Sequence, residues 1–235
     1  MSLGRKTFLS ASLLAAAAVL TSCKNNGSAQ AGYAEYFPVL EPKDYDYAGM
    51  MATLRNPNPH KQVFSTSSIL VQPGANYAAI YAHMQFAMNG YDLSIGPGSG
   101  KLATLAVFSG ASVALALNDD MWQTYRIGDR YGIAKTNIYY KAKSDLDVHS
   151  TPSNPHGLYQ DLSGQAVLAR GGSFMVCHNA LANFAAGAAA RLSKAPNNVL
   201  EEMLHNLLPG FKIVPAGVTA VQLAQEHGWK LYTVA

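Results

Sequence analysis

The 235-residue chain is short of charged residues and of cysteines, and each shortage excludes a class of protein. Charged residues make up only 13% of the sequence, and no cluster of Lys and Arg occurs, so we do not expect nucleic acid as a partner. The chain has two cysteines, Cys23 and Cys177. No apolar run reaches the roughly 20 residues that span a bilayer, which argues against a permanent transmembrane helix.

Metal-binding and phosphate-binding motifs are also missing. The sequence contains no HExxH, no CxxCH and no zinc-type spacing of Cys and His, so we expect neither a metal nor a cofactor. The glycine-rich segment 96–101 is superficially similar to a phosphate-binding loop. It departs from that motif because Ile95 stands where the first glycine belongs and Leu102 replaces the Ser or Thr. We therefore expect an ordinary turn at 96–101.

Residues 1–23 have the pattern of a bacterial signal peptide. Arg5 and Lys6 precede a short apolar run, which ends in small residues. The run ends at Leu20-Thr21-Ser22-Cys23, which resembles the lipobox of bacterial lipoproteins, where the cysteine is lipidated and becomes the first residue. The pattern predicts an exported protein of the cell envelope that faces the periplasm, slightly favouring the outer membrane, and contacts the membrane only through lipid at Cys23. Cleavage without lipidation would instead give a secreted protein.

Residues 24–58 have little hydrophobic periodicity. Their first part, 24–30, is polar and small, as in a flexible spacer, and scattered tyrosines and prolines follow. We expect a flexible tether and an irregular arm here, packed on the domain or on a neighbouring subunit. With Cys23 consumed by lipid, Cys177 has no partner for a disulfide within the chain.

From residue 59 to residue 235 apolar strands alternate with amphipathic helices. This order predicts an α/β domain with a mostly parallel sheet covered on both faces. The segment 141–160 lacks periodicity and reads as an inserted surface loop. We expect strands at 60–65, 102–108, 173–177, 211–215 and 229–234, and helices ending near 89 and spanning about 113–125, 161–170, 180–192, 198–208 and 219–227.

The segment 173–179 is the most informative about function. Cys177 falls at the carboxyl end of a buried strand and just before a helix, where ligands and chemistry collect in open α/β sheets. The positive end of the helix dipole would stabilise a thiolate there. His178 could add charge, although consecutive strand residues point to opposite faces. Free cysteine is also a common buried small hydrophobe, so a reactive and an inert Cys177 are both open from these residues.

Four segments together resemble the DsrE/DsrF-like family of small α/β proteins linked with sulfur relay. The resemblance covers roughly residues 60–235, with 141–160 as an insertion, and its most specific part is the carboxyl end. It implies a flavodoxin-like three-layer sandwich with a mostly parallel sheet of about five strands, and a tendency to form homo-oligomers. The segments that carry it are 60–64, 176–181, 207–210 and 214–229.

The resemblance also implies a chemistry. Some members of the family carry a cysteine that accepts sulfane sulfur as a persulfide and passes it on, and others lack it and serve as structural partners. Cys177 matches that cysteine, which makes it the expected catalytic residue, with His178 and Asn179 as candidates to support it. The expected function is an envelope-anchored sulfur carrier that exchanges sulfur with a donor or acceptor protein, and any enzymatic activity would be sulfur transfer through this single cysteine.

Two alternatives of other classes accompany this expectation. In the first, the protein is a non-catalytic oligomeric binding or scaffold subunit with a buried, inert Cys177. In the second, the carboxyl ends of the strands capture a small molecule without thiol chemistry, which requires a well-formed apolar pocket at that edge.

Overall fold

A five-stranded, all-parallel sheet lies at the centre of the computed structural model, which describes residues 39–235 except 73, 96–100, 148–150 and 154. The predicted signal peptide, Cys23 and most of the glycine-rich turn therefore lie outside the described residues. The strand order is β4-β3-β2-β1-β5. The strands are β1 (Lys61–Thr66), β2 (Ala103–Phe108), β3 (Ser173–Cys177), β4 (Phe211–Val214) and β5 (Lys230–Thr233).

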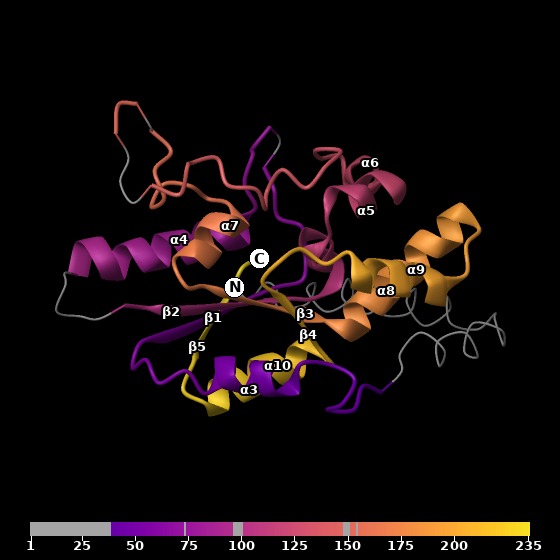
Figure 1. Ribbon diagram of the computed structural model, residues 1–235, viewed down its shortest axis with the longest axis horizontal. Helices are drawn as coiled ribbons and strands as arrows, with labels where there is room; N and C mark the ends of the chain where they lie inside the picture. The colour runs from indigo at the N-terminus through magenta and orange to yellow at the C-terminus, as the bar shows by residue number, and fades with distance from the viewer. Residues whose placement is uncertain (1–38, 73, 96–100, 148–150, 154) are drawn as a thin grey trace, which may run out of the picture. The chain divides into compact units, whose positions relative to one another are not determined.

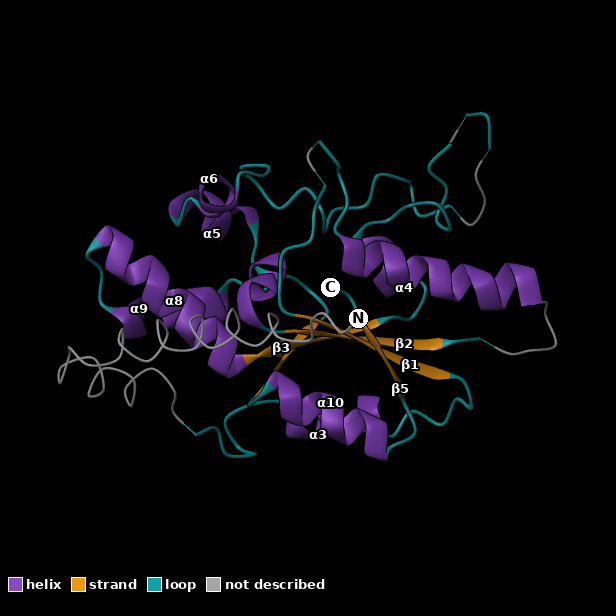
Figure 2. Ribbon diagram, turned by 180° about the vertical axis from the view of Figure 1, so that it is seen from behind, coloured by secondary structure: helices purple, strands orange, loops and turns teal. Residues whose placement is uncertain are grey.

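Helices cover both faces of the sheet, as Figures 1 and 2 show. The connections from β1 to β4 proceed in one direction across the sheet and place their helices on one face. The connection from β4 to β5 runs back across the sheet, so its helix covers the opposite face, as right-handed crossovers require. The first face carries α4 (Ala79–Asn89), α5 (Asp119–Thr124), α6 (Ile127–Tyr131), α7 (Gly164–Ala169), α8 (His178–Leu192) and α9 (Pro196–His205), and the second carries α3 (Tyr47–Leu54) and α10 (Gly217–Glu226).

This arrangement confirms the predicted α/β class and its flavodoxin-like three-layer sandwich. The central strand β2 is buried from its second residue onward, whereas all four residues of the edge strand β5 are exposed. A continuous apolar run such as β2 is typical of a parallel strand covered on both faces. No helix in the described part of the chain is both long enough and apolar enough to cross a bilayer.

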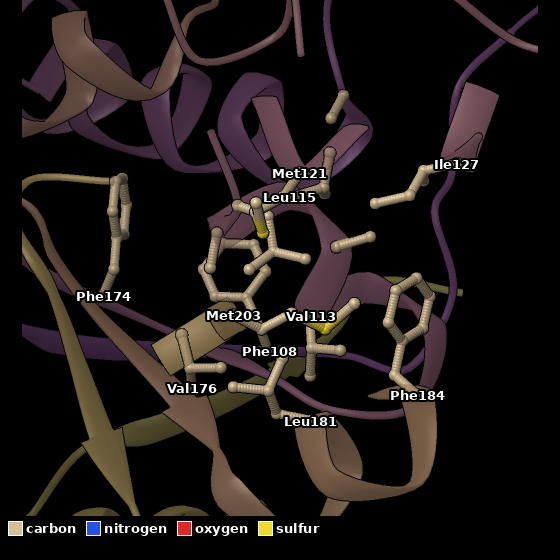
Figure 3. Packing of buried hydrophobic residues seen from close by; sticks show 14 of the residues in the cluster. Phe108, Val113, Leu115, Met121, Ile127, Phe174, Val176, Leu181, Phe184 and Met203 are labelled. Carbon is tan, nitrogen blue, oxygen red and sulfur yellow. The ribbon is translucent and has the colours of Figure 1, made fainter. Parts of the chain in front are cut away.

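Alternate residues of the strands enter two separate cores. Phe108 and Phe174 join the main core on the side of α8, where their rings pack edge to face with centroids 5.7 Å apart. Figure 3 shows part of this cluster, including Phe184 of α8. Val107 and Met175 enter the second core beneath α3 and α10. The sheet is therefore fixed from both sides, which holds the carboxyl ends of its strands in place.

Part of the predicted irregular arm at 24–58 is a helix, so that prediction is wrong for α3. Asp46 caps the helix by accepting a hydrogen bond from the backbone N–H of Gly49, at 2.8 Å. Met50 and Leu54 are buried in the second core, and the indole Nε1 of Trp229 donates to the carbonyl of Leu54. Sequence periodicity missed α3 because a two-turn helix buries only these two apolar side chains.

The single helix predicted over 113–125 is also wrong. A 3₁₀ helix, η2 (Gly110–Ala116), ends before Leu117, which forms an isolated antiparallel bridge with Leu207. Asn118 then starts α5 by accepting a hydrogen bond from the N–H of Met121. The apolar residues spaced four apart all face the same core, although Leu117 lies between the two short helices, so their periodicity does not reveal the break.

The helix predicted over 198–208 does not begin at Asn198. Helix α9 begins two residues earlier, with Pro196 in its first turn and Ala195 as the cap, without a side-chain cap bond. Proline favours this position because its fixed φ suits a helix and its missing N–H is not needed in the first turn.

The described residues of 141–160 form neither a helix nor a strand, as predicted for an inserted loop. Asp161 anchors the loop: its buried carboxylate accepts hydrogen bonds from the backbone N–H groups of Lys143, Ser144 and Ser163. Burial alone would raise the pKa of this carboxyl, but these hydrogen bonds outweigh it and lower the pKa below its ordinary value. The predicted helix at 161–170 is accordingly shorter, because Asp161 belongs to the loop and α7 starts only at Gly164.

Candidate functional site

Cys177 ends β3 and caps the amino end of α8. Its Sγ accepts a hydrogen bond from the backbone N–H of Ala180, at 3.3 Å. The thiol therefore occupies the position that Ser, Thr or Asp commonly takes at a helix start, where a side-chain acceptor satisfies an otherwise unpaired N–H group. The residue is 7% exposed, so its side chain is largely but not completely covered.

Gly217, the first residue of α10, packs directly against Cys177. An added Cβ at Gly217 would lie 3.2 Å from the Cβ of Cys177, 3.3 Å from the Cβ of Ser109 and 3.4 Å from the Cγ1 of Val107. These distances are at or below the close limit of ordinary contacts, so the residue at 217 has to be small. The amino ends of α8 and α10 consequently meet at Cys177.

Ser109 completes this edge of the sheet at the end of β2. Its hydroxyl donates to the carbonyl of Thr66, at 3.0 Å, and its backbone N–H donates to the hydroxyl of Ser112. The backbone N–H of Asn179 donates to the carbonyl of Pro215, at 3.4 Å, and ties the start of α8 to the segment before α10. Residues at or directly after the carboxyl ends of four parallel strands, β1 to β4, are thus linked along this edge of the sheet.

The two predicted neighbours of Cys177 have different surroundings. The side chain of Asn179 is exposed, and only its backbone has the hydrogen bond described above. His178 is 3% exposed, and its Nδ1 has no hydrogen-bond partner among the described residues. Burial lowers the pKa of His178, which favours the neutral imidazole. Neither side chain forms a recorded hydrogen bond to the sulfur.

The chemistry that this site supports depends on the groups next to the Sγ of Cys177. The N–H of Ala180 and the amino ends of α8 and α10 place positive partial charge from the backbone next to Cys177. The described residues contain no group of three or more His, Cys, Asp and Glu side chains arranged to hold a metal ion. The centre is thus a single free thiol held by backbone groups.

Several hollows open on the surface away from Cys177. One of about 350 Å³ is lined in part by Asn118, Asp120 and Lys141, and another of about 310 Å³ lies against Phe86 of α4. Neither includes Cys177 in its lining, but the second is lined by residues that follow β1 and β5, among them Leu70 and Val234, so a hollow does lie at the carboxyl ends of these two strands.

Sequence reasoning located Cys177 but missed Ser109 and Gly217. Both follow strands that flank β3, and the strand order alone would have placed them beside the cysteine. Comparison of the chain with protein-family models, with curated proteins and with solved structures finds no match.

Proposed function

We propose that this protein is an envelope-anchored sulfur carrier in which Cys177 holds sulfane sulfur as a persulfide. The observation that carries the proposal is the hydrogen bond from the Ala180 N–H to the Sγ of Cys177, at the start of a 15-residue helix. A negative sulfur atom is favoured there, both in the thiolate and in the persulfide anion. The resemblance of the sequence to DsrE/DsrF-like proteins supports the same chemistry.

The transfer step needs only a donor that already contains sulfane sulfur. The Cys177 thiolate attacks the terminal sulfur of a hydropersulfide, R–S–SH. A sulfur–sulfur bond forms at Cys177 while the sulfur–sulfur bond of the donor, RS–SH, breaks, and R–S⁻ leaves with the bonding electron pair. The thiol proton of the donor stays with the transferred sulfur or passes to R–S⁻. No external oxidant or reductant is consumed, and delivery to an acceptor thiolate is the reverse of the same exchange.

The test is the mass of the protein after exposure to inorganic polysulfide. The full chain carrying Cys23→Ser should gain sulfur on Cys177, and the Cys23→Ser/Cys177→Ser protein should gain none. Serine is a good helix cap, so the control should keep α8 intact, which circular dichroism checks. A Cys177 that gains no sulfur in the folded protein would contradict the proposal.

Membrane attachment is the second part of the proposal, and the signal-peptide and lipobox pattern of residues 1–23 supports it. In a bacterial host, the wild-type chain should fractionate with membranes and incorporate labelled fatty acid. The Cys23→Ser variant should lose both properties. Fatty-acid incorporation that persists in Cys23→Ser would rule out this anchor.

A second candidate function is a non-catalytic oligomeric scaffold, which the low exposure of Cys177 favours. The edge strand β5 is where a second copy of this chain would pair, because its outer side is unpaired within the described residues and Leu231 and Tyr232 are 42% and 40% exposed. In that case Leu231→Lys should convert an oligomer to a monomer by light scattering, and polysulfide should leave Cys177 unmodified. An oligomer whose mass is unchanged in Leu231→Lys would exclude this edge.

A further inference from the structure

A hollow of about 480 Å³ lies between α6 and the carboxyl end of α8, away from Cys177. We call it the arginine hollow because three of its lining side chains are guanidinium groups. Its lining residues are Tyr125, Arg126, Asp129, Arg130, Arg191 and Leu192.

The positive charges in the arginine hollow outnumber the negative ones. Arg126 pairs with Asp129, with 2.9 Å between Nε and Oδ2. Arg130 and Arg191 form no ion pair with any described carboxylate. Burial lowers the pKa of Arg191, and the charge of Arg130 lowers it further, yet a guanidinium stays protonated at neutral pH. Two like charges are thus held together without a counter-ion from the described residues.

Both unpaired guanidinium groups are oriented in advance. Arg130 lies over the rings of Tyr131 and Phe184, with 5.2 Å and 5.7 Å from its Cζ to the ring centroids. Arg191 donates from Nη1 to the carbonyl of Gly187, at 2.9 Å. A Cβ added at Gly187 would meet Nη1 of Arg130 at 3.7 Å and Nη1 of Arg191 at 3.9 Å. The guanidinium donors of Arg130 on α6 and Arg191 on α8 therefore lie close together over Gly187, which has no side chain.

The frame around these groups is rigid. Ile127 of α6 and Phe184 of α8 both belong to the main core, and both are labelled in Figure 3. On the far side, Glu202 of α9 accepts a hydrogen bond from the hydroxyl of Tyr125 and is 3.9 Å from the ammonium of Lys194. That carboxylate is engaged with its own partners, and none of its recorded contacts is to Arg130 or Arg191.

We propose that the arginine hollow binds a phosphate group, carried by a small soluble phosphate ester or by a lipid headgroup. A tetrahedral dianion has enough oxygen atoms to accept hydrogen bonds from two guanidinium forks at once and neutralises both charges. The partial negative charge at the carboxyl end of α8 disfavours anions, so the two arginines have to supply the attraction. The site is separate from Cys177, and its occupancy does not depend on the sulfur chemistry.

Calorimetric titration of the full chain with inorganic phosphate tests this site. We expect saturable binding whose dissociation constant rises at least about tenfold in Arg130→Gln and in Arg191→Gln, because each loses a charge-assisted hydrogen-bonding fork. Arg191→Lys should bind with intermediate affinity, since it keeps the charge but not the fork. Arg55→Gln, at an exposed arginine outside the hollow, is the matched control and should bind as wild type.

Vesicles distinguish the two sources of phosphate. If the ligand is a lipid headgroup, the Cys23→Ser chain should bind phosphatidylglycerol vesicles but not phosphatidylcholine vesicles, and Arg130→Gln and Arg191→Gln should release it. Either phosphate or vesicle binding that depends on these two arginines supports the proposal. Binding of neither probe, or binding that both substitutions leave unchanged in folded protein, would overturn it.

Discussion

The two ends of helix α8 interact with a negative charge in opposite ways. At the amino end, Cys177 receives the N–H of Ala180, and the start of α10 at Gly217 packs beside it. At the carboxyl end the helix dipole repels an anion, and Arg130 and Arg191 face a hollow there with no carboxylate partner in the described part of the chain. Backbone groups therefore favour the anion at one end, whereas side-chain charge has to attract it at the other.

The two ends also differ in access to solvent. Cys177 is 7% exposed and tightly enclosed, while Arg130 and Arg191 lie on an open surface. Enclosure limits which reagents reach the sulfur and shields its interactions from salt. The arginine hollow admits larger ligands, and its attraction is screened by ions.

The largest expected effect comes from reversing one charge at the carboxyl end. Arg130→Glu should weaken phosphate binding by more than about a hundredfold, because it removes a donor fork and places a carboxylate where an anion would bind. Calorimetry gives the affinity, and Arg55→Glu serves as the charge-matched control. Phosphate affinity that falls equally in both variants would show a diffuse charge effect instead of a site.

A steric change at the amino end should be next in size. Gly217→Val places new atoms against Cys177 and Ser109, whose Cβ atoms lie 3.2 Å and 3.3 Å from the new Cβ. We expect the free energy of unfolding to fall by about 1–3 kcal/mol, as for other overpacked sites, and sulfur loading of Cys177 to slow. Urea unfolding and the polysulfide assay measure the two effects. Val218→Ala, at the 79% exposed neighbouring residue, should change neither, and a fully stable Gly217→Val would contradict the close packing.

The pH dependence of the free energy of unfolding should show that a positive charge on His178 is disfavoured at the amino end of α8. Burial lowers the pKa of His178, so below about pH 6.5 the unfolded chain binds more protons at this residue than the folded chain does. Its contribution to stability is therefore complete above about pH 6.5 and falls with decreasing pH, by at most about 1.4 kcal/mol per pH unit. His178→Gln should reduce this slope in urea unfolding between pH 7 and pH 5.5. The exposed His205→Gln is the control, and an unchanged slope in His178→Gln would disprove the assignment.

The smallest expected effect is a difference between the two ends of α8 in their response to salt. Raising the ionic strength from about 0.05 M to about 0.3 M should weaken phosphate binding severalfold, because the Debye length shortens around exposed charges. Alkylation of Cys177 by an uncharged reagent should change by less than about twofold, since the dipoles act at short range in a covered site. Equal salt dependence of phosphate binding and of Cys177 alkylation would contradict the proposed electrostatic difference between the two ends.

The two ends of α8 also differ in how much of each could be predicted from the sequence. The apolar run of β3 and the small residues after it gave the position of Cys177 at the strand–helix junction. Gly217 and Ser109 could not be placed beside it without the strand order. Arg130 and Arg191 are far apart in the sequence, and one of them lies on a five-residue helix that carries no periodic signal.

The fold was predictable where long apolar patterns decide it. All five strands were predicted close to their observed bounds. The clearest signals were β2 and β3, because buried parallel strands are continuous apolar runs between turn residues. The failures were short elements: α3 buries only Met50 and Leu54, and the break at Asn118 depends on a side-chain cap within an otherwise helical pattern. Sequence patterns of so few residues are a weak signal, because tertiary packing decides whether such short segments are helical.

The measurement that tests the central claim most directly is the alkylation rate of Cys177 in the full Cys23→Ser chain at increasing urea below the unfolding transition. If the folded protein exposes a reactive thiolate, the rate is nearly independent of urea and exceeds by at least about a hundredfold the rate that the unfolded fraction could supply. If the rate instead rises with urea in proportion to the unfolded fraction, Cys177 reacts only after unfolding, and it is not a sulfur carrier in the native protein.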